Sequence, residues 1–188
     1  MDFFRKAFVF IFDILESIVV ALAIFVVIYL FAFQPHQVKG KSMYPNFDDG
    51  QYILTDKISY RFASPKRGDV IVFKSPQNKD IDFIKRIIGL PGDQIMILQN
   101  AYYVNGQKLD EPYIPPENFL YPGSFLKEGE ELTVPTTMYF VSGDNRPHSS
   151  DSREFGPIER SSIIGRSFMR YWPLANFGFI PHPTYALP

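Results

Sequence analysis

The chain has 188 residues, a formal net charge of -1 and no cysteine, which excludes disulfides, a cysteine nucleophile and thiolate metal sites. No run of basic residues occurs, and a nucleic-acid-binding protein needs a basic patch, so we expect no nucleic-acid partner. The histidines His36, His148 and His182 are far apart in the sequence. We therefore expect no metal site and no cofactor.

Residues 8–33 are almost wholly apolar, and positions 17–33 carry no charge. As a helix rising about 1.5 Å per residue, this run is long enough for the ~30 Å hydrocarbon core of a bilayer. It is longer than the ~7–15 apolar residues of a cleavable signal peptide, and no small-x-small triplet follows it. We therefore predict a single-pass anchor in a lipid bilayer, preceded by a short tail at residues 1–7.

The charges beside the predicted anchor do not fix its orientation. Arg5 and Lys6 favour a cytoplasmic tail, but Lys39 and Lys41 lie just beyond the other end of the apolar run. Because the positive-inside rule compares the two sides, this near balance leaves the orientation open.

After the anchor, short apolar and aromatic-rich segments alternate with turn residues, a pattern typical of β structure. The predicted strands are residues 51–56, 69–74, 81–89, 94–98, 102–104, 107–109, 138–142 and 162–172. Asn105-Gly106 predicts a tight hairpin. Residues 110–130 are rich in Pro, Glu and Gly and predict an irregular segment, and the polar stretch 143–156 predicts a loop. The fold expected is mostly β, an antiparallel sheet or barrel.

Ser42 and Lys85 are the candidates for chemistry. A serine hydroxyl needs a base to remove its proton, and His148, the one histidine in a polar loop, is a weak candidate for that base. Lys85 lies in a predicted strand whose two faces are both largely apolar, and burial lowers the pKa of a lysine from its ordinary value near ~10.4. Ser42 alone could be an ordinary turn residue, and Lys85 could be structural, paired with Asp82 or Asp93.

Four segments in order resemble the bacterial type I signal peptidase family. They are Ser42-Met43-Tyr44-Pro45, residues 67–73 (RGDVIVF), residues 85–93 (KRIIGLPGD), and Gly143-Asp144-Asn145-Arg146 continuing to Ser149 and Asp151-Ser152-Arg153. A weaker match is Arg170-Tyr171-Trp172-Pro173.

The resemblance implies a role for each matched residue. Ser42 is implied to be the nucleophile, with its backbone N–H holding the oxyanion, and Lys85 the general base. Ser149 is implied to orient the base. The implied ionic scaffold of the catalytic loop is Asp144, Arg146, Asp151 and Arg153, and the residues near substrate pockets for small side chains are Met43, Phe83 and Ile84.

The resemblance also implies a fold and an activity. The fold is an antiparallel β-sheet, barrel-like peptidase domain over residues 34–188, with a small inserted subdomain at about residues 100–135, behind one N-terminal transmembrane helix. The activity is removal of signal peptides from exported pre-proteins. The implied location is the cytoplasmic (inner) membrane, with the catalytic domain on the outer face.

Two positions depart from the family pattern. Asn46 follows the motif proline, where threonine is common, and Gly40 lies where some members carry a hydroxyl that helps to hold the oxyanion. We expect the Ser42 N–H to donate to the oxyanion, assisted by the Gly40 N–H or a water.

Two other functions are compatible with parts of the pattern. A non-catalytic membrane-anchored β module that binds exported chains would not need Ser42 or Lys85. A self-cleaving repressor of the serine/lysine type would carry a DNA-binding segment where this chain has its apolar run. Ser42, Lys85 and the charged loop together favour the peptidase.

Overall fold

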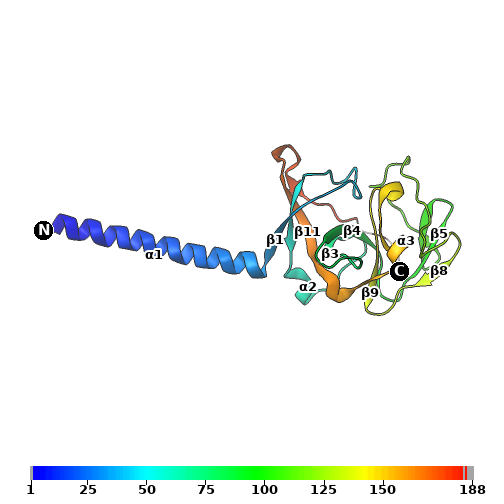
Figure 1. Ribbon diagram of the computed structural model, residues 1–188, viewed down its shortest axis with the longest axis horizontal. Coiled ribbons are helices and arrows are strands. Elements are labelled where there is room, and N and C mark those ends of the chain that lie inside the picture. Colours follow the sequence, from blue (N-terminus) through cyan, green and yellow to red (C-terminus); the bar gives the residue numbers. More distant parts are fainter. Residues whose placement is uncertain (1, 184, 186–188) are drawn as a thin grey trace.

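The computed structural model describes residues 2–183 and 185. Its helix α1 (Asp2–Phe31) projects from one side of a β domain, and a small sheet lies at the opposite end (Figure 1). The helix begins at Asp2, so most of the tail predicted for residues 1–7 is helical.

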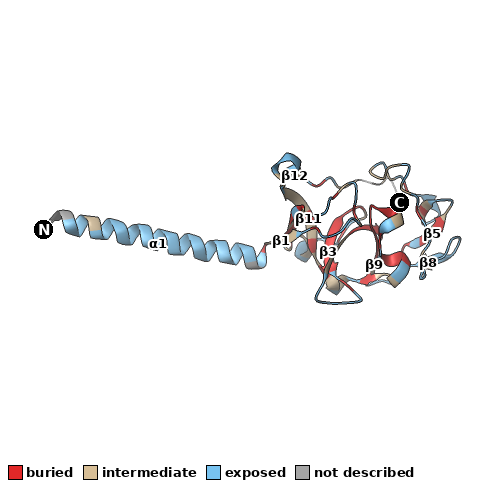
Figure 2. Cartoon of the chain, turned by 45° about the horizontal axis from the view of Figure 1, so that its top comes forward, coloured by how far each residue is buried: buried red, intermediate tan, exposed pale blue. Residues whose placement is uncertain are grey.

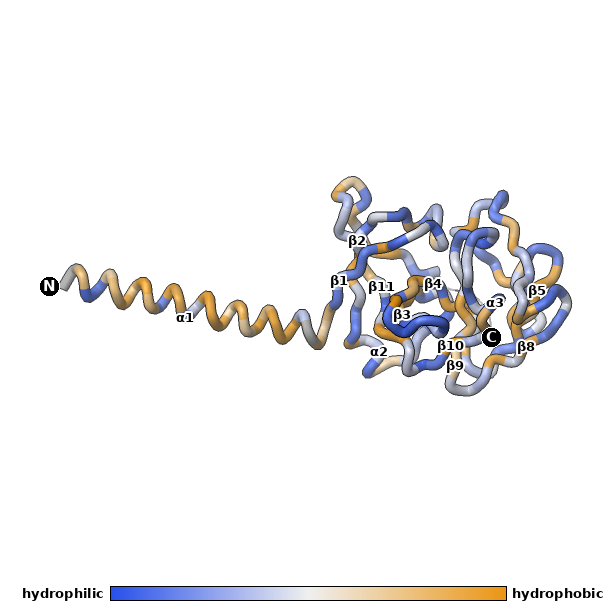
Figure 3. Tube along the Cα trace, viewed as in Figure 1, coloured by the Kyte–Doolittle hydropathy of each residue, from blue (hydrophilic) through white to orange (hydrophobic). Residues whose placement is uncertain are grey.

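The apolar side chains of α1 are exposed along most of its length (Figure 2), and Figure 3 shows the apolar character running along the helix. Among the described residues, α1 is the one helix long and apolar enough to cross a membrane, over Phe4–Tyr29. An apolar surface of this extent would be costly in water, so the structure is consistent with membrane anchoring.

The larger sheet is antiparallel, with strand order β1-β2-β11-β3-β4-β9-β10, and β12 pairs with β11. Its strands are β1 (Phe33–Gln37), β2 (Tyr52–Asp56), β3 (Val70–Lys74), β4 (Asp82–Gly89), β9 (Met138–Ser142), β10 (Ile158–Glu159), β11 (Ile163–Trp172) and β12 (Gly178–Phe179). The mostly β, antiparallel fold predicted from the sequence is confirmed. Strand β1 was not predicted, because residues 33–37 follow the apolar run directly and do not alternate.

The smaller sheet has the order β7-β6-β5-β8. Its strands are β5 (Gln94–Leu98), β6 (Ala101–Val104), β7 (Gln107–Lys108) and β8 (Glu131–Thr133). The hairpin predicted at Asn105-Gly106 is confirmed: both residues have positive φ, 52° and 78°, as a type I′ turn requires. Since β5 pairs with both β6 and β8, this sheet begins before the predicted subdomain boundary at residue 100.

Short helical turns connect the strands. They are α2 (Ser59–Phe62), η1 (Arg146–His148), α3 (Ser152–Phe155), η2 (Arg160–Ser162) and η3 (Leu174–Asn176). Two of these, η1 and α3, lie within residues 143–156, which the sequence predicted as a loop. Asp151 caps α3 by accepting a hydrogen bond from the Arg153 backbone N–H, a common role of aspartate at a helix start.

Strands β3 and β4 are buried on both faces (Figure 2). Val70 and Val72 of β3 pack into one apolar cluster, whereas the alternate residues Ile71 and Phe73 pack into another on the opposite face. A third cluster joins Ile88 and Phe140 to the small sheet. Because both faces are covered from residue 85 onward, the side chains of Lys85 and Arg86 are held away from water.

Candidate active site

The loop between β1 and β2 presents Ser42. Backbone hydrogen bonds close its ends, from Gly50 N to Val38 O at 2.9 Å and from Val38 N to Gln51 O at 2.8 Å. Met43 and Phe47, each at most 2% exposed, anchor the loop in the core. The anchored loop leaves the Ser42 side chain half-buried beside β4.

Lys85 of β4 contacts this serine directly. Its Nζ lies 2.8 Å from Ser42 Oγ and 3.1 Å from the Ile84 carbonyl oxygen. The residue is 4% exposed. Burial lowers the pKa of Lys85 to about 8, although the charges of Asp151 and Asp144 act in the opposite direction. A substantial fraction of this amine is therefore neutral at mildly alkaline pH and able to accept a proton.

The structural interpretation of Lys85, as a partner of Asp82 or Asp93, is wrong. Asp82 pairs with Lys74 at 2.7 Å, and Asp93 pairs with Arg67 at 2.8 Å. His148, the weaker candidate base, is exposed on η1. The hydroxyl of Ser42 is hydrogen-bonded to Lys85 and not to this histidine.

The segment 143–149 packs against the back of the Ser42 loop. Asn145 donates from its backbone N–H to Ser42 O at 3.0 Å and from Nδ2 to Lys41 O at 2.9 Å. A Cβ on Gly143 would collide with Ser42 O and with the Ser149 side chain, so the close approach requires glycine. These contacts fix the backbone that carries Ser42, the candidate nucleophile.

Asn46, the residue that departs from the family pattern, also joins the two segments. Its Nδ2 donates to Asp144 Oδ2 at 2.9 Å and to Tyr113 O at 3.0 Å. The side-chain amide therefore connects the Ser42 loop to Asp144 and to Tyr113. An amide nitrogen has two N–H donors, so it can make both hydrogen bonds at once.

Ser149 lies beside Gly143, next to the Ser42 backbone. Its hydroxyl is buried and has no hydrogen-bond partner among residues 2–183 and 185. The structure thus brings Ser149 to the site without a hydrogen bond to Lys85, and its role in orienting the base stays a prediction.

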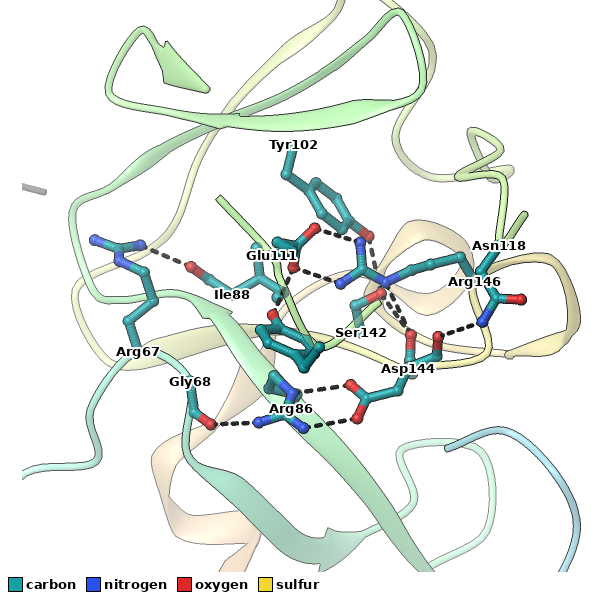
Figure 4. A network of polar contacts seen from close by, with 12 residues as sticks. Arg67, Gly68, Arg86, Ile88, Tyr102, Glu111, Asn118, Ser142, Asp144 and Arg146 are labelled. Atoms are coloured by element: carbon teal, nitrogen blue, oxygen red, sulfur yellow. Dashed lines mark hydrogen bonds and ion pairs between the residues drawn. The ribbon is translucent and has the colours of Figure 1, made fainter. Parts of the chain in front are cut away.

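The four charged residues of the predicted scaffold were expected to pair with one another, and only two of them do. Asp151 and Arg153 do pair with each other, with nitrogen–oxygen distances of 2.8 and 2.7 Å. Asp144 instead accepts two hydrogen bonds from Arg86, at 2.9 and 2.7 Å, and Arg146 binds Glu111 (Figure 4). Sequence analysis missed Arg86 and Glu111 as partners. The available signal was Arg86 itself, since a buried arginine needs an acidic partner.

The chain beyond β12 covers this ionic scaffold. The Arg86 guanidinium stacks 4.1 Å from the centre of the Tyr113 ring, and Tyr113 OH lies 2.6 Å from Tyr185 OH. Gly68 leaves room for Pro183 and Tyr185, because a Cβ at Gly68 would collide with both. Residues 180–183 and Tyr185 therefore lie beside Arg86.

A cleft of about 260 Å³ opens beside Ser42. One wall is formed by residues 36–39 and the other by residues 81–85, with Ile53, Val72 and Ser150 between them. Of the three expected pocket residues, Phe83 and Ile84 line the cleft. Met43 lies instead in the core beneath the loop, where it is 1% exposed, and its Sδ accepts a hydrogen bond from the Asp144 N–H at 3.4 Å.

Both walls of the cleft present free strand edges. Strand β1 is the terminal strand of the sheet. Residues 82–85 of β4 pair with β3 on one edge, whereas β9 pairs with β4 only from Arg86 onward in the described part of the chain. Unpaired backbone groups of this kind can bind an extended peptide as an added strand.

The Gly40 N–H already has a hydrogen-bond partner, which contradicts its expected assistance to the oxyanion, whereas the Ser42 N–H and a water as donors stay predictions. The group donates to Asp49 Oδ1 at 2.7 Å. Gly40 has a φ of 82°, in the left-handed region, which disfavours any residue with a side chain at this position. No group of three or more metal-binding side chains occurs among the described residues, and the expectation of a metal-free site stays a prediction.

The family model for signal peptidase, peptidase S26, matches residues 11–172. The chain belongs to the S26 signal peptidase family. Signal peptidase I of Bacillus caldolyticus is 41% identical over 167 residues, covering 85% of this chain and 91% of the relative. Signal peptidase IB of Staphylococcus aureus strain MRSA252 is 34% identical over 178 residues, covering 89% and 92%.

A crystal structure of a signal peptidase I from Enterococcus faecalis V583 is 36% identical and covers 55% of this chain and 97% of that chain, with a TM-score of 0.47. The resemblance to type I signal peptidases seen in the sequence is confirmed by the family match and the relatives. Membership of the S26 family supports signal peptidase activity by a serine peptidase, with the N-terminal helix suited to anchor it.

Proposed function

We propose that the chain cleaves signal peptides from exported pre-proteins with a Ser42–Lys85 dyad. The observation that carries the proposal is the 2.8 Å contact between Ser42 Oγ and Lys85 Nζ at the mouth of a cleft. Helix α1 anchors the enzyme in the cytoplasmic membrane, and the β domain works at the outer face. The reaction needs no cofactor and no nucleic acid.

The pre-protein binds as an extended strand between the free edges of β1 and β4. Small side chains at its first and third positions before the cut enter the apolar part of the cleft, near Phe83 and Ile84. Backbone hydrogen bonds give affinity, while the side-chain pockets give specificity.

Neutral Lys85 takes the proton of the Ser42 hydroxyl as Oγ attacks the scissile carbonyl carbon. The Ser42 N–H donates to the developing oxyanion. When the C–N bond breaks, the Lys85 ammonium gives this proton to the leaving amine, and an ester remains on Ser42. Lys85 then takes a proton from water, the hydroxide attacks the ester, and Ser42 recovers its proton from Lys85.

The test is cleavage of a purified pre-protein in lipid vesicles by wild type and by Ser42→Ala. We expect cleavage after a small residue, and a fall in kcat on the order of 10⁴-fold or more in the variant, because the nucleophile is lost. Ser161→Ala, on exposed η2 away from the cleft, is the matched control and should keep wild-type activity. Binding of the pre-protein without cleavage by folded wild type would favour the non-catalytic β module instead.

A further inference from the structure

The lining of the cleft includes a pair of polar side chains besides Ser42 and Lys85. His36 of β1 and Asp82 of β4 face each other, with Nε2 of the imidazole 3.4 Å from Oδ2 of the carboxylate. The other ring nitrogen, Nδ1, lies 2.9 Å from Thr55 Oγ1. Thr55 is fully buried, so the imidazole is held in one orientation.

The lining of the cleft includes the apolar residues Val38, Ile53, Val72 and Ile84. His36 is therefore a polar side chain among apolar ones in the cleft lining, with its side chain only 12% exposed. Its Nε2 atom is buried, and the 3.4 Å contact of this atom with Asp82 Oδ2 is long and does not meet hydrogen-bond geometry. Buried polar atoms in folded proteins are nearly always satisfied, so Nε2 retains capacity to bond a group that arrives with the substrate.

The protonation state of His36 suits a hydroxyl. Burial lowers the pKa of His36, although Asp82 acts in the opposite direction, so the ring is neutral at pH 7. A neutral imidazole has one donor and one acceptor nitrogen. A hydroxyl is both donor and acceptor, so it can bond to Nε2 in either tautomer, whereas a methyl group can bond in neither.

The spacing assigns the position of the substrate residue. His36 lies on β1, and Val38 follows the last residue of β1, where its backbone still pairs with Gln51 and Gly50. The two residues are therefore on the same face of extended backbone, about 6.6 Å apart at the ordinary strand rise. Side chains at the first and third positions of an extended substrate have the same separation. If the first side chain lies near Val38 and Ser42, the third lies against His36.

We propose that His36, held by Thr55 and Asp82, selects a small hydroxyl side chain, threonine or serine, at the third residue before the cleaved bond. The inference rests on the proposed function, in which the residues before the cut occupy this cleft. It adds a specificity-determining residue from β1, outside the segments that match the family pattern.

The test compares two pairs of otherwise identical signal-peptide substrates, with Thr or Val and with Ser or Ala at the third position. Thr and Val have nearly the same shape, so their ratio of kcat/KM isolates the hydroxyl. We expect wild type to favour Thr over Val by about tenfold or more, because a site built to bind a hydroxyl discriminates against the analogue that lacks it.

His36→Leu should lower the Thr/Val ratio to about one or less while the Val peptide is still cleaved, because the hydroxyl then has no partner. His182→Leu is the matched control: His182 is another half-buried histidine, but it lines a different cavity, and the ratio should stay at the wild-type value. Both ratios are measured within one preparation, so a partly unfolded fraction cancels. A wild-type ratio near one, or a ratio unchanged in His36→Leu, would overturn the inference.

The same peptide pairs are also titrated against Ser42→Ala protein by fluorescence anisotropy. If wild type cleaved no peptide, the proposed function would fail, and the binding ratio would decide the inference by itself. Tighter binding of the Thr peptide, lost in Ser42→Ala/His36→Leu, would support the selective role of His36. Equal binding of both peptides, or binding of neither, would refute it.

Discussion

Two consecutive cations on β4 have opposite environments. The Arg86 guanidinium is neutralised by two hydrogen bonds to Asp144, whereas the Lys85 amine contacts the neutral hydroxyl of Ser42. Because successive strand residues point to opposite faces, one strand supplies both a structural ion pair and the base proposed here. The difference in partner explains why burial lowers the pKa of the lysine without removing the charge of the arginine.

The pH dependence of cleavage tests this assignment. In the proposed mechanism neutral Lys85 is the active form, and its pKa is about 8, so kcat/KM should rise with pH and reach half of its plateau near pH 8. Below that pH, activity should fall about tenfold per unit, since each unit lowers the neutral fraction tenfold. The measurement is a rate profile from pH 6 to pH 10 with a short peptide substrate.

Lys85→Arg is the control for this profile, because a guanidinium stays protonated throughout the range. It should be inactive at every pH. An ascending limb centred near pH 10, the ordinary range of an exposed lysine, would contradict the assignment of buried Lys85 as the base.

At the scale of elements, two segments distant in sequence are joined backbone to backbone. The β1–β2 loop carries Ser42, and the segment that leads into η1 approaches it closely enough for Asn145 N to bond Ser42 O at 3.0 Å. Gly143 makes the approach possible. The position of the nucleophile is thus set by packing between two loops as well as by its own turn.

Gly143→Ala should displace the Ser42 backbone, because the added Cβ meets Ser42 O and Ser149. We expect kcat to fall on the order of 10²-fold, the effect of a displacement near 1 Å at a reacting group, with KM changed much less. The measurement is peptide cleavage under saturating and limiting substrate. Gly178→Ala, with nothing within 4 Å of its Cβ position, is the matched control, and equal activity in the two variants would refute the loop-packing argument.

At the scale of the whole molecule, α1 and the β domain have separate roles. The helix is exposed along most of its length, while the three core clusters of the β domain contain no residue of α1. The geometry of the candidate site therefore depends on the β domain, and in the proposed function the helix confines the chain to the membrane surface where pre-proteins are cleaved.

A chain that begins at Ala32 should keep the kcat of the full chain for a short soluble peptide within about threefold, because α1 supplies no residue of the site. Its activity on a pre-protein in vesicles should fall by 10²-fold or more, since co-localisation raises effective concentration by factors of that order. Replacing α1 by an unrelated apolar helix of equal length should restore activity on the pre-protein in vesicles. Equal loss on both substrates would show that α1 shapes the site itself.

The sequence by itself determined the features that depend on local pattern. The apolar run of α1, the strand segments, the Asn105-Gly106 hairpin and the Ser42 and Lys85 motifs follow from residues close together in the chain, whose spacing matches the period of a helix, a strand or a turn. The mostly β fold and the family could therefore be predicted before any contact was known.

Only the tertiary structure decided which distant residues meet. It paired Asp144 with Arg86 and Arg146 with Glu111 rather than with one another, used the Gly40 N–H to hold Asp49, and placed His36 of β1 in the cleft. The local sequence around a charged or hydrogen-bonding residue does not indicate which distant residue will be its partner. The choice is made when sheet curvature and loop packing bring residues from different strands together, and burial then requires each polar group to be satisfied.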